Sequence, residues 1–125
     1  MERNGFILGD SRALNTALLE QIRTGAKTAS CGALRDFEED GEALPEVGRR
    51  DMALDWDAEP ALVVETTAVE ILPFSAVIED FAKAEGAADL ASWQADHRAY
   101  FERNGGFAPD MKVVCERFKL VEVFS

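Results

Sequence analysis

The fold of this chain is organised around the segment Arg23-Thr24-Gly25-Ala26-Lys27-Thr28-Ala29-Ser30-Cys31, in which a helical pattern gives way to small residues around one lysine. Gly25 permits the left-handed backbone that ends a helix, and the small residues after it leave room for a ligand. A lysine with hydroxyls one and three residues later supplies a base and a nucleophile, as in Ser-Lys acyl-transfer enzymes. The simpler interpretation is a helix cap, a buried strand and a solvated Lys27.

On both sides of this segment the spacing of apolar residues predicts regular structure. A three-to-four spacing before Gly25, with Asp10 or Ser11 placed as a cap, predicts a helix over 11–24. After it, we expect a short buried strand over 28–31, a helical turn over 33–39 that ends near Gly41, and a surface loop over 42–50 that carries Pro45 and Gly48.

Three later segments have the alternation of strands. Residues 51–56 place Met52, Leu54 and Trp56 on one parity, and residues 111–124 alternate over their whole length. Residues 62–72 are rich in Val, Ile and Thr, and their apolar parity changes around 68–72, which predicts a bulge or a sharp bend.

Two further helices are expected between the strands over 62–72 and 111–124. Ser75 is placed to cap a helix that runs to about Ala84, and Ser92 to cap another that stops at Asn104-Gly105-Gly106. Helices interspersed irregularly among long, bent strands predict an α+β fold of one domain over 1–125, with a small curled sheet or barrel.

The composition restricts the classes of function. The net charge of −11 and pI near 4.4 weigh against salt-driven wrapping of a polyanion, although basic residues gather near the C-terminus and one face could tolerate a phosphate. No apolar stretch reaches the ~20 residues of a membrane span. One histidine and two cysteines predict no metal and no cofactor, and the absence of an export signal predicts a cytoplasmic protein with Cys31 and Cys115 reduced.

Several separated stretches together resemble the ASCH domain family, whose PUA-like fold implies a small mixed β-barrel flanked by helices. They are Gly25-Ala26-Lys27-Thr28-Ala29-Ser30, Glu46-Val47-Gly48, Glu85-Gly86 with Asp89-Leu90 and Trp93, His97 with Tyr100-Phe101, and Val113-Val114-Cys115-Glu116-Arg117-Phe118. The resemblance implies an RNA-related role. It also implies a second activity, because some members are small amidohydrolases that remove acyl groups from the exocyclic nitrogen of cytidine with a lysine, a threonine and a glutamate.

By this resemblance the catalytic lysine is Lys27, the glutamate is Glu85, and Ser30 replaces the threonine. Serine keeps the hydroxyl that the chemistry needs. Residues three apart point to opposite faces of a regular strand, so Lys27 and Ser30 meet only if the backbone turns between them, and Thr28 is the alternative hydroxyl. Cys31 is more simply explained as packing than as a nucleophile.

Other residues are candidates for substrate binding. Trp93 and Tyr100 either pack in the core or line a pocket of the size of a base, and Arg117 is a candidate partner for a substrate phosphate or carbonyl. His97 fits a helix surface or a hydrogen bond within the fold better than a metal ligand. Glu116 and Arg117 lie on opposite faces of one strand, so at most one of them points inward.

Two main functions follow. The first is an amidohydrolase for N-acylated pyrimidine nucleosides such as N4-acetylcytidine, in which the partner is a small, neutral nucleoside-like substrate. The second is a module that binds single-stranded or modified RNA, with or without strand cleavage, which the acidic net charge disfavours. A small-metabolite binding module is a third alternative, and the sequence leaves the acyl group, the oligomeric state and the pathway open.

Overall fold

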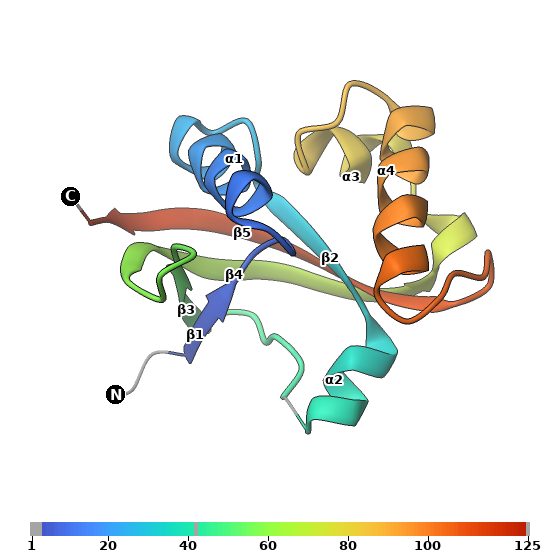
Figure 1. The fold of residues 1–125 in the computed structure, drawn as a ribbon, viewed down its shortest axis with the longest axis horizontal. Helices are drawn as coiled ribbons and strands as arrows, with labels where there is room; N and C mark the ends of the chain where they lie inside the picture. Colours follow the sequence, from blue (N-terminus) through green and yellow to red (C-terminus); the bar gives the residue numbers. More distant parts are fainter. Residues whose placement is uncertain (1–3, 42, 125) are drawn as a thin grey trace.

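The structure is a computed structural model that describes residues 4–41 and 43–124 (Figure 1). Its elements in chain order are β1 (Asn4–Ile7), α1 (Arg12–Thr24), β2 (Ala29–Ala33), α2 (Leu34–Asp40), β3 (Arg50–Leu54), β4 (Pro60–Pro73), the 3-10 turn η1 (Phe74–Ala76), α3 (Glu79–Ala84), α4 (Leu90–Arg103) and β5 (Lys112–Val123). The expected helix over 11–24 and the long strands over 62–72 and 111–124 are confirmed. Glu42, in the expected loop over 42–50, lies outside the described residues.

Helix α1 begins and ends as its sequence predicts. The Ser11 hydroxyl accepts a hydrogen bond from the Leu14 N–H at 3.2 Å, so Ser11, and not Asp10, is the cap. Gly25 has a φ of 86° and its N–H donates to the Ile22 carbonyl, which closes the helix. The chain therefore leaves α1 in a fixed direction just before Lys27.

The five strands form one sheet in the order β1-β3-β4-β5-β2, in which β1 is parallel to β3 and the other neighbours are antiparallel. The long strands β4 and β5 are its centre. Their pairing register shifts between Val63 and Val64 and again between Thr66 and Ala68, so the bend expected from the change of parity is present.

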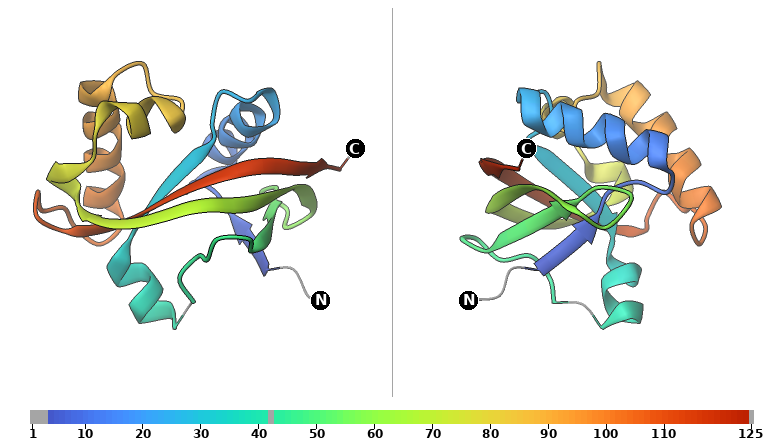
Figure 2. Two further views of the ribbon diagram at one scale, coloured as in Figure 1. Left: turned by 180° about the vertical axis from the view of Figure 1, so that it is seen from behind. Right: turned by 60° about the vertical axis from the view of Figure 1, so that its left-hand side comes forward.

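The expected closed barrel is wrong. A barrel requires the edge strands β1 and β2 to pair with each other, and no such pairing is present among the described residues. Residues of both edge strands instead line a cavity. The fold is therefore an open, curved α+β sheet. Figures 1 and 2 show that helices α1, α3 and α4 lie on one side of the β4 and β5 pair and that α2 lies on the other.

Two apolar clusters hold the helices on the sheet. Under α3 and α4 the cluster includes Phe74, Phe81, Trp93, Phe101 and Val113. Under α1 it consists of Ile22, Ala53, Leu62, Val64 and Phe118. The cavity between the edge strands borders both clusters, so packed side chains fix its walls on two sides.

Several details of the expected elements need correction. Strand β1 was not expected, because it is only four residues long and contains Gly5. The helix after Ser75 begins at Glu79, following the separate turn η1, and Ile78, which precedes it, is 61% exposed. The next helix is capped by Asp89, whose carboxylate accepts from the Ser92 N–H at 2.7 Å, so Ser92 lies inside the helix.

Strand β3 also differs from its expected form. It ends at Leu54, so Asp55 and Trp56 belong to the turn that follows. Its buried parity is Asp51 and Ala53, because the larger Met52 and Leu54 lie on the partly exposed face. A carboxylate is thus placed on the inner face of the sheet. No helix within 4–41 and 43–124 is long and apolar enough to cross a membrane.

Candidate active site

A cavity of about 930 Å³ lies between the two edge strands of the sheet. Its lining includes residues from β1, α1, β2, α2, the loop before β3, the start of α4 and the middle of β5. Lys27, Ser30 and Glu85 all line it, which brings the three expected catalytic residues to one cavity.

Lys27 is held in the short link between α1 and β2. Its N–H donates to the Gln21 carbonyl at 3.0 Å, and the N–H of Thr28 donates to the Ala84 carbonyl at 2.6 Å. These bonds tie the link to α1 on one side and to the end of α3 on the other. Lys27 is 5% exposed, so its side chain runs inward to the cavity.

Glu85 ends α3 and is oriented from two directions. Gly86, which follows it, has a φ of +99°, a backbone conformation that glycine adopts without strain. Glu85 Oε2 accepts a hydrogen bond from Trp93 Nε1 at 2.7 Å and lies 2.8 Å from His97 Nε2. Oε1 is buried and has no hydrogen-bond partner in the part of the chain that the structure describes. One carboxylate oxygen is thus fixed and the other is free for a ligand.

Burial and mutual charge set the pKa values of this pair. Burial lowers the pKa of Lys27 below its usual range, although the Glu85 carboxylate opposes this effect. Burial pushes the pKa of Glu85 upward, but Lys27, His97 and Trp93 together outweigh it, and the net direction is downward. Glu85 is therefore a carboxylate at neutral pH, and Lys27 is easier to deprotonate than an exposed lysine.

His97 contacts both Trp93 and Glu85. His97 Nδ1 lies 3.0 Å from the Trp93 carbonyl, which can only accept, so Nδ1 carries a hydrogen. Nε2 lies 2.8 Å from Glu85 Oε2, within hydrogen-bond distance. The His97 and Trp93 rings stack at 4.3 Å, which fixes this geometry. The expectation of a hydrogen bond within the fold is confirmed for His97, but its partnership with Glu85 was not expected from the sequence.

Ser30 lies within β2, whereas Lys27 precedes the first residue of that strand, Ala29. The alternation of a regular strand therefore does not separate them, and both line the cavity. Within the described residues, the Ser30 hydroxyl has no side-chain hydrogen bond, so it is available to a substrate.

The alternative nucleophiles fit less well. Thr28 is exposed, does not line this cavity, and its hydroxyl lies 3.5 Å from the Ala84 carbonyl. A hydrogen bond with Cys115 and burial hold the pKa of the Cys31 thiol well above its usual value, so a thiolate is disfavoured there. Cys31 and Cys115 form no disulfide among the described residues, and their reduced state stays a prediction.

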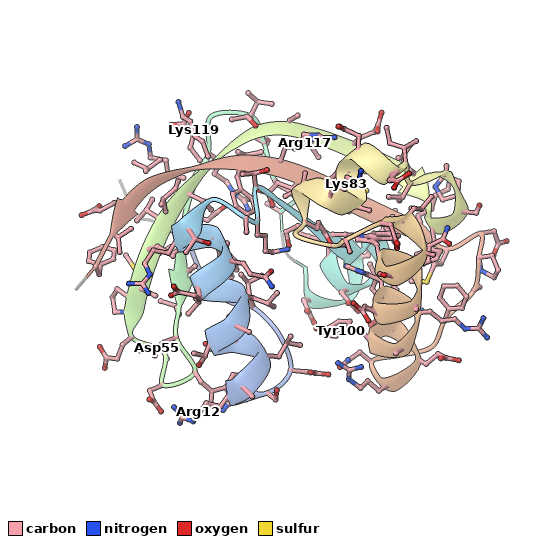
Figure 3. All side chains as sticks on the ribbon, turned by 90° about the horizontal axis from the view of Figure 1, so that it is seen from above. Arg12, Asp55, Lys83, Tyr100, Arg117 and Lys119 are labelled. Atoms are coloured by element: carbon pink, nitrogen blue, oxygen red, sulfur yellow. The ribbon has the colours of Figure 1, made fainter. Side chains whose placement is uncertain are left out.

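The expected substrate-binding residues are divided between two places. Trp93 is 1% exposed and stacks on Phe74 at 5.2 Å, so most of its surface is in the core and its indole nitrogen serves Glu85. Tyr100 is half-buried and lines the cavity. Arg117, labelled in Figure 3, is not among the residues that line the cavity. It is paired with Asp80 at 2.9 Å and lies over the ring of Phe81. The structure therefore does not bring Arg117 to the site.

A second polar group lies along another part of the cavity lining. Arg49 Nε donates to Asp51 Oδ2 at 3.0 Å, and the Thr66 hydroxyl donates to Glu116. Burial and the nearby Asp51 charge raise the pKa of Glu116. Of this group, only Glu116 was a candidate from the sequence. Asp51 was missed because the large apolar residues beside it predicted that the opposite face of its strand is buried.

The comparisons agree with this architecture. Residues 5–122 match the family model of the ASCH domain. A crystal structure of a protein from Enterococcus faecalis V583, assigned to the DUF984 family, is 33% identical with a TM-score of 0.90, over 98% of this chain and 78% of that one. The crystal structure of an ASCH domain from Lactobacillus crispatus JV V101 is 31% identical with a TM-score of 0.87, over 97% and 80%. A search of curated proteins finds no match.

Proposed function

This chain belongs to the ASCH domain family, and we propose that it is a small amidohydrolase that removes the acyl group from an N-acylated pyrimidine nucleoside such as N4-acetylcytidine. One observation carries the proposal. A buried lysine, a carboxylate with one free oxygen and an unengaged serine hydroxyl line the same cavity. These are the groups that acyl transfer through a covalent ester requires.

The reaction begins with attack of Ser30 Oγ on the acyl carbonyl carbon. A carbon–oxygen bond forms, and the hydroxyl proton passes to the neutral amine of Lys27. The resulting ammonium lies in a buried site, where its charge stabilises the developing oxyanion more strongly than it would in water. Burial of the lysine thus supports both the acceptance of the proton and the stabilisation of charge.

The carbon–nitrogen bond then breaks, and the exocyclic amine of the pyrimidine leaves with a proton from Lys27. Water hydrolyses the acyl-serine and restores the hydroxyl. Glu85 keeps the lysine oriented by charge, while Trp93 and His97 hold the carboxylate in place. A cavity of about 930 Å³ is within the size range of small-molecule sites, which supports a substrate of the size of a nucleoside.

RNA binding is the alternative function. Its affinity would depend on cations that neutralise phosphates, and the net charge of −11 opposes such binding. Arg117, the basic residue first considered for a phosphate, is already paired with Asp80 outside the cavity. Salt separates the two functions, because binding of an oligonucleotide weakens steeply with added salt whereas turnover of a neutral nucleoside does not.

Hydrolysis of N4-acetylcytidine to cytidine, followed by chromatography, tests the proposal. We expect turnover by the unmodified protein and a loss of ~10² or more in kcat/KM for Lys27→Met. Lys83→Met is the matched control, because the Lys83 side chain is 60% exposed and lies outside the cavity. Equal rates for Lys27→Met and the unmodified protein would show that the lysine has no catalytic role.

A further inference from the structure

Asp51 has a buried carboxylate oxygen without a partner. Its side chain is 6% exposed, and Oδ2 accepts from Arg49 Nε at 3.0 Å, but Oδ1 has no hydrogen bond to any residue within 4–41 and 43–124. A buried, unsatisfied acceptor destabilises a fold, and native proteins contain few of them. Asp51 lines the cavity, so a donor on a bound ligand can satisfy Oδ1.

This oxygen belongs to a polar row that crosses the sheet and ends at Ser30. The Asp51 charge acts on Glu116, whose carboxylate accepts from Thr66 of β4. Glu116 in turn is the register partner of Ser30 across β5 and β2. Directly opposed residues of antiparallel strands carry their side chains on the same face of the sheet. Asp51, Glu116 and the proposed nucleophile therefore line one cavity from β3, β5 and β2.

The charges of the lining are unsuited to an anion. Its described residues include five carboxylates, Asp36, Asp51, Glu85, Asp96 and Glu116, against three cations, Lys27, Arg49 and Arg103. Arg103 is bonded to Asp10, and Lys27 is under the influence of Glu85. The Arg49 guanidinium is held by Asp51 and by the carbonyl oxygen of Leu44 at 3.3 Å. Arg49 and Arg103 are thus already engaged, and acceptors for ligand donors remain.

We propose that Asp51 and Glu116 form a subsite that binds hydroxyl groups of an uncharged sugar and discriminates against phosphorylated ligands. Asp51 Oδ1 accepts directly from a hydroxyl, and Glu116 contributes a second polar contact beside Ser30. The inference rests on the proposed function only in placing the acyl group at Ser30. It adds that the enzyme acts on a free nucleoside in preference to a nucleotide or RNA.

Turnover of matched substrates tests the subsite. We expect kcat/KM for N4-acetyl-2′,3′-dideoxycytidine to be ~10- to 100-fold below that for N4-acetylcytidine, which corresponds to the loss of hydrogen bonds to a charged acceptor. N4-acetylcytidine 5′-monophosphate should also be a poorer substrate than the nucleoside. Equal rates for the three substrates in the unmodified protein would overturn the proposal.

Asp51→Asn reverses the chemistry at one atom. Because Arg49 donates at the Oδ2 position, the amide oxygen takes that position and the NH₂ group replaces Oδ1. An acceptor for sugar hydroxyls becomes a donor, so we expect the diol preference to fall to within about threefold and the discrimination against phosphate to weaken. Asp110→Asn, at an exposed residue outside the cavity, should keep both preferences. Unchanged preferences in Asp51→Asn would contradict the assignment.

A fragment experiment separates this proposal from the amidohydrolase itself and needs no variant. Methyl β-D-ribofuranoside is titrated into the unmodified protein while the side-chain carboxyl carbon of Asp51 is followed by NMR. We expect a saturable shift, a smaller one with the dideoxy analogue, and weaker binding of ribose 5-phosphate. Such shifts without hydrolysis of any acylated nucleoside would support the subsite and contradict the proposed reaction. No saturable shift, or equal binding of the phosphate, would overturn the subsite.

Discussion

Trp93 Nε1 and Glu85 Oε2 are 2.7 Å apart in a part of the protein where both residues are almost fully buried. The two residues come from different helical segments, so this bond fixes the end of α3 against α4. A hydrogen bond to a charged acceptor at a buried position is stronger than an ordinary one. The orientation of the site carboxylate is therefore coupled to the packing of the core.

Trp93→Phe keeps an aromatic ring against Phe74 but removes the donor to Glu85. We expect the free energy of unfolding to fall by about 2–4 kcal/mol, from the lost charged hydrogen bond and the cavity left by the smaller ring. Chemical denaturation measures this change. Trp56→Phe is the control, because Trp56 is 37% exposed and outside the cavity, and a loss of similar size there would contradict the role of the bond.

His97→Phe should raise the pKa of Glu85, since the His97 ring lowers it through a hydrogen bond and through charge. His97→Gln is the informative companion, because its amide can still donate to Oε2 and should leave the pKa of Glu85 closer to that of the unmodified protein. Titration of the Glu85 carboxyl carbon by NMR provides the measurement. An identical pKa of Glu85 in the unmodified protein and in His97→Phe would show that the ring does not act on the carboxylate.

The lowered pKa of Glu85 predicts a loss of stability in acid. Its folded-state pKa is below the ordinary value of 4.5, so the stabilisation that ionised Glu85 provides is fully present above pH 4.5. It disappears as the pH falls from 4.5 through the folded-state pKa. The unfolding free energy of the unmodified protein, relative to that of Glu85→Gln, should therefore decrease below pH 4.5. A difference that stays constant between pH 6 and acid would contradict this prediction.

Cys31 and Cys115 should both titrate as free thiols after denaturation. In the native protein, the raised pKa of Cys31 predicts alkylation at pH 8 that is slower than that of a free cysteine, because the thiolate is the reactive form. Mass spectrometry after timed exposure to iodoacetamide follows each thiol separately. Native Cys31 that reacts as fast as a free cysteine would show the prediction to be wrong.

The parts of the fold that the sequence predicts are those with local signals. Ser11 and Gly25 mark the ends of α1, and the parity change in β4 indicates its bend. Sheet closure is not a local property, because it depends on where β1 and β2 lie after folding. Strand β1 is also too short to give a recognisable alternation in the sequence. The open edge that results is also where the cavity lies.

The residues of the candidate site also differ in whether the sequence could identify them. The spacing of Lys27 and Ser30 suggested a base and a nucleophile, Glu85 was identified through the family resemblance, and the cavity that all three line is known only from the structure. The sequence could not distinguish His97 from an ordinary surface residue of a helix. Its role depends on a contact with Glu85, which lies twelve positions earlier in the sequence, before a loop. Asp51 was expected on the exposed face of its strand, but the sheet buries the smaller residues of β3. Asp51 lines the cavity, and Ala53 belongs to the apolar cluster under α1.

The role of Lys27 is the last and most discriminating prediction. Burial lowers the pKa of its amine and Glu85 opposes this, with burial the larger effect, so a neutral amine is accessible for accepting the proton of Ser30. Arginine keeps a positive charge and cannot act as a base in this range. We therefore expect Lys27→Arg to lose ~10² or more in kcat/KM toward N4-acetylcytidine, as Lys27→Met does.

A second measurement separates this loss from a failure to fold. Both Lys27 variants should keep the circular dichroism of the unmodified protein, and Lys27→Met should raise the pKa of Glu85, because the lysine charge lowers it. Lys27→Arg should leave that pKa low, since the charge remains. If folded Lys27→Arg instead keeps a substantial part of the activity while Lys27→Met has none, the lysine acts by its charge on the oxyanion, and the proton of Ser30 must pass to Glu85.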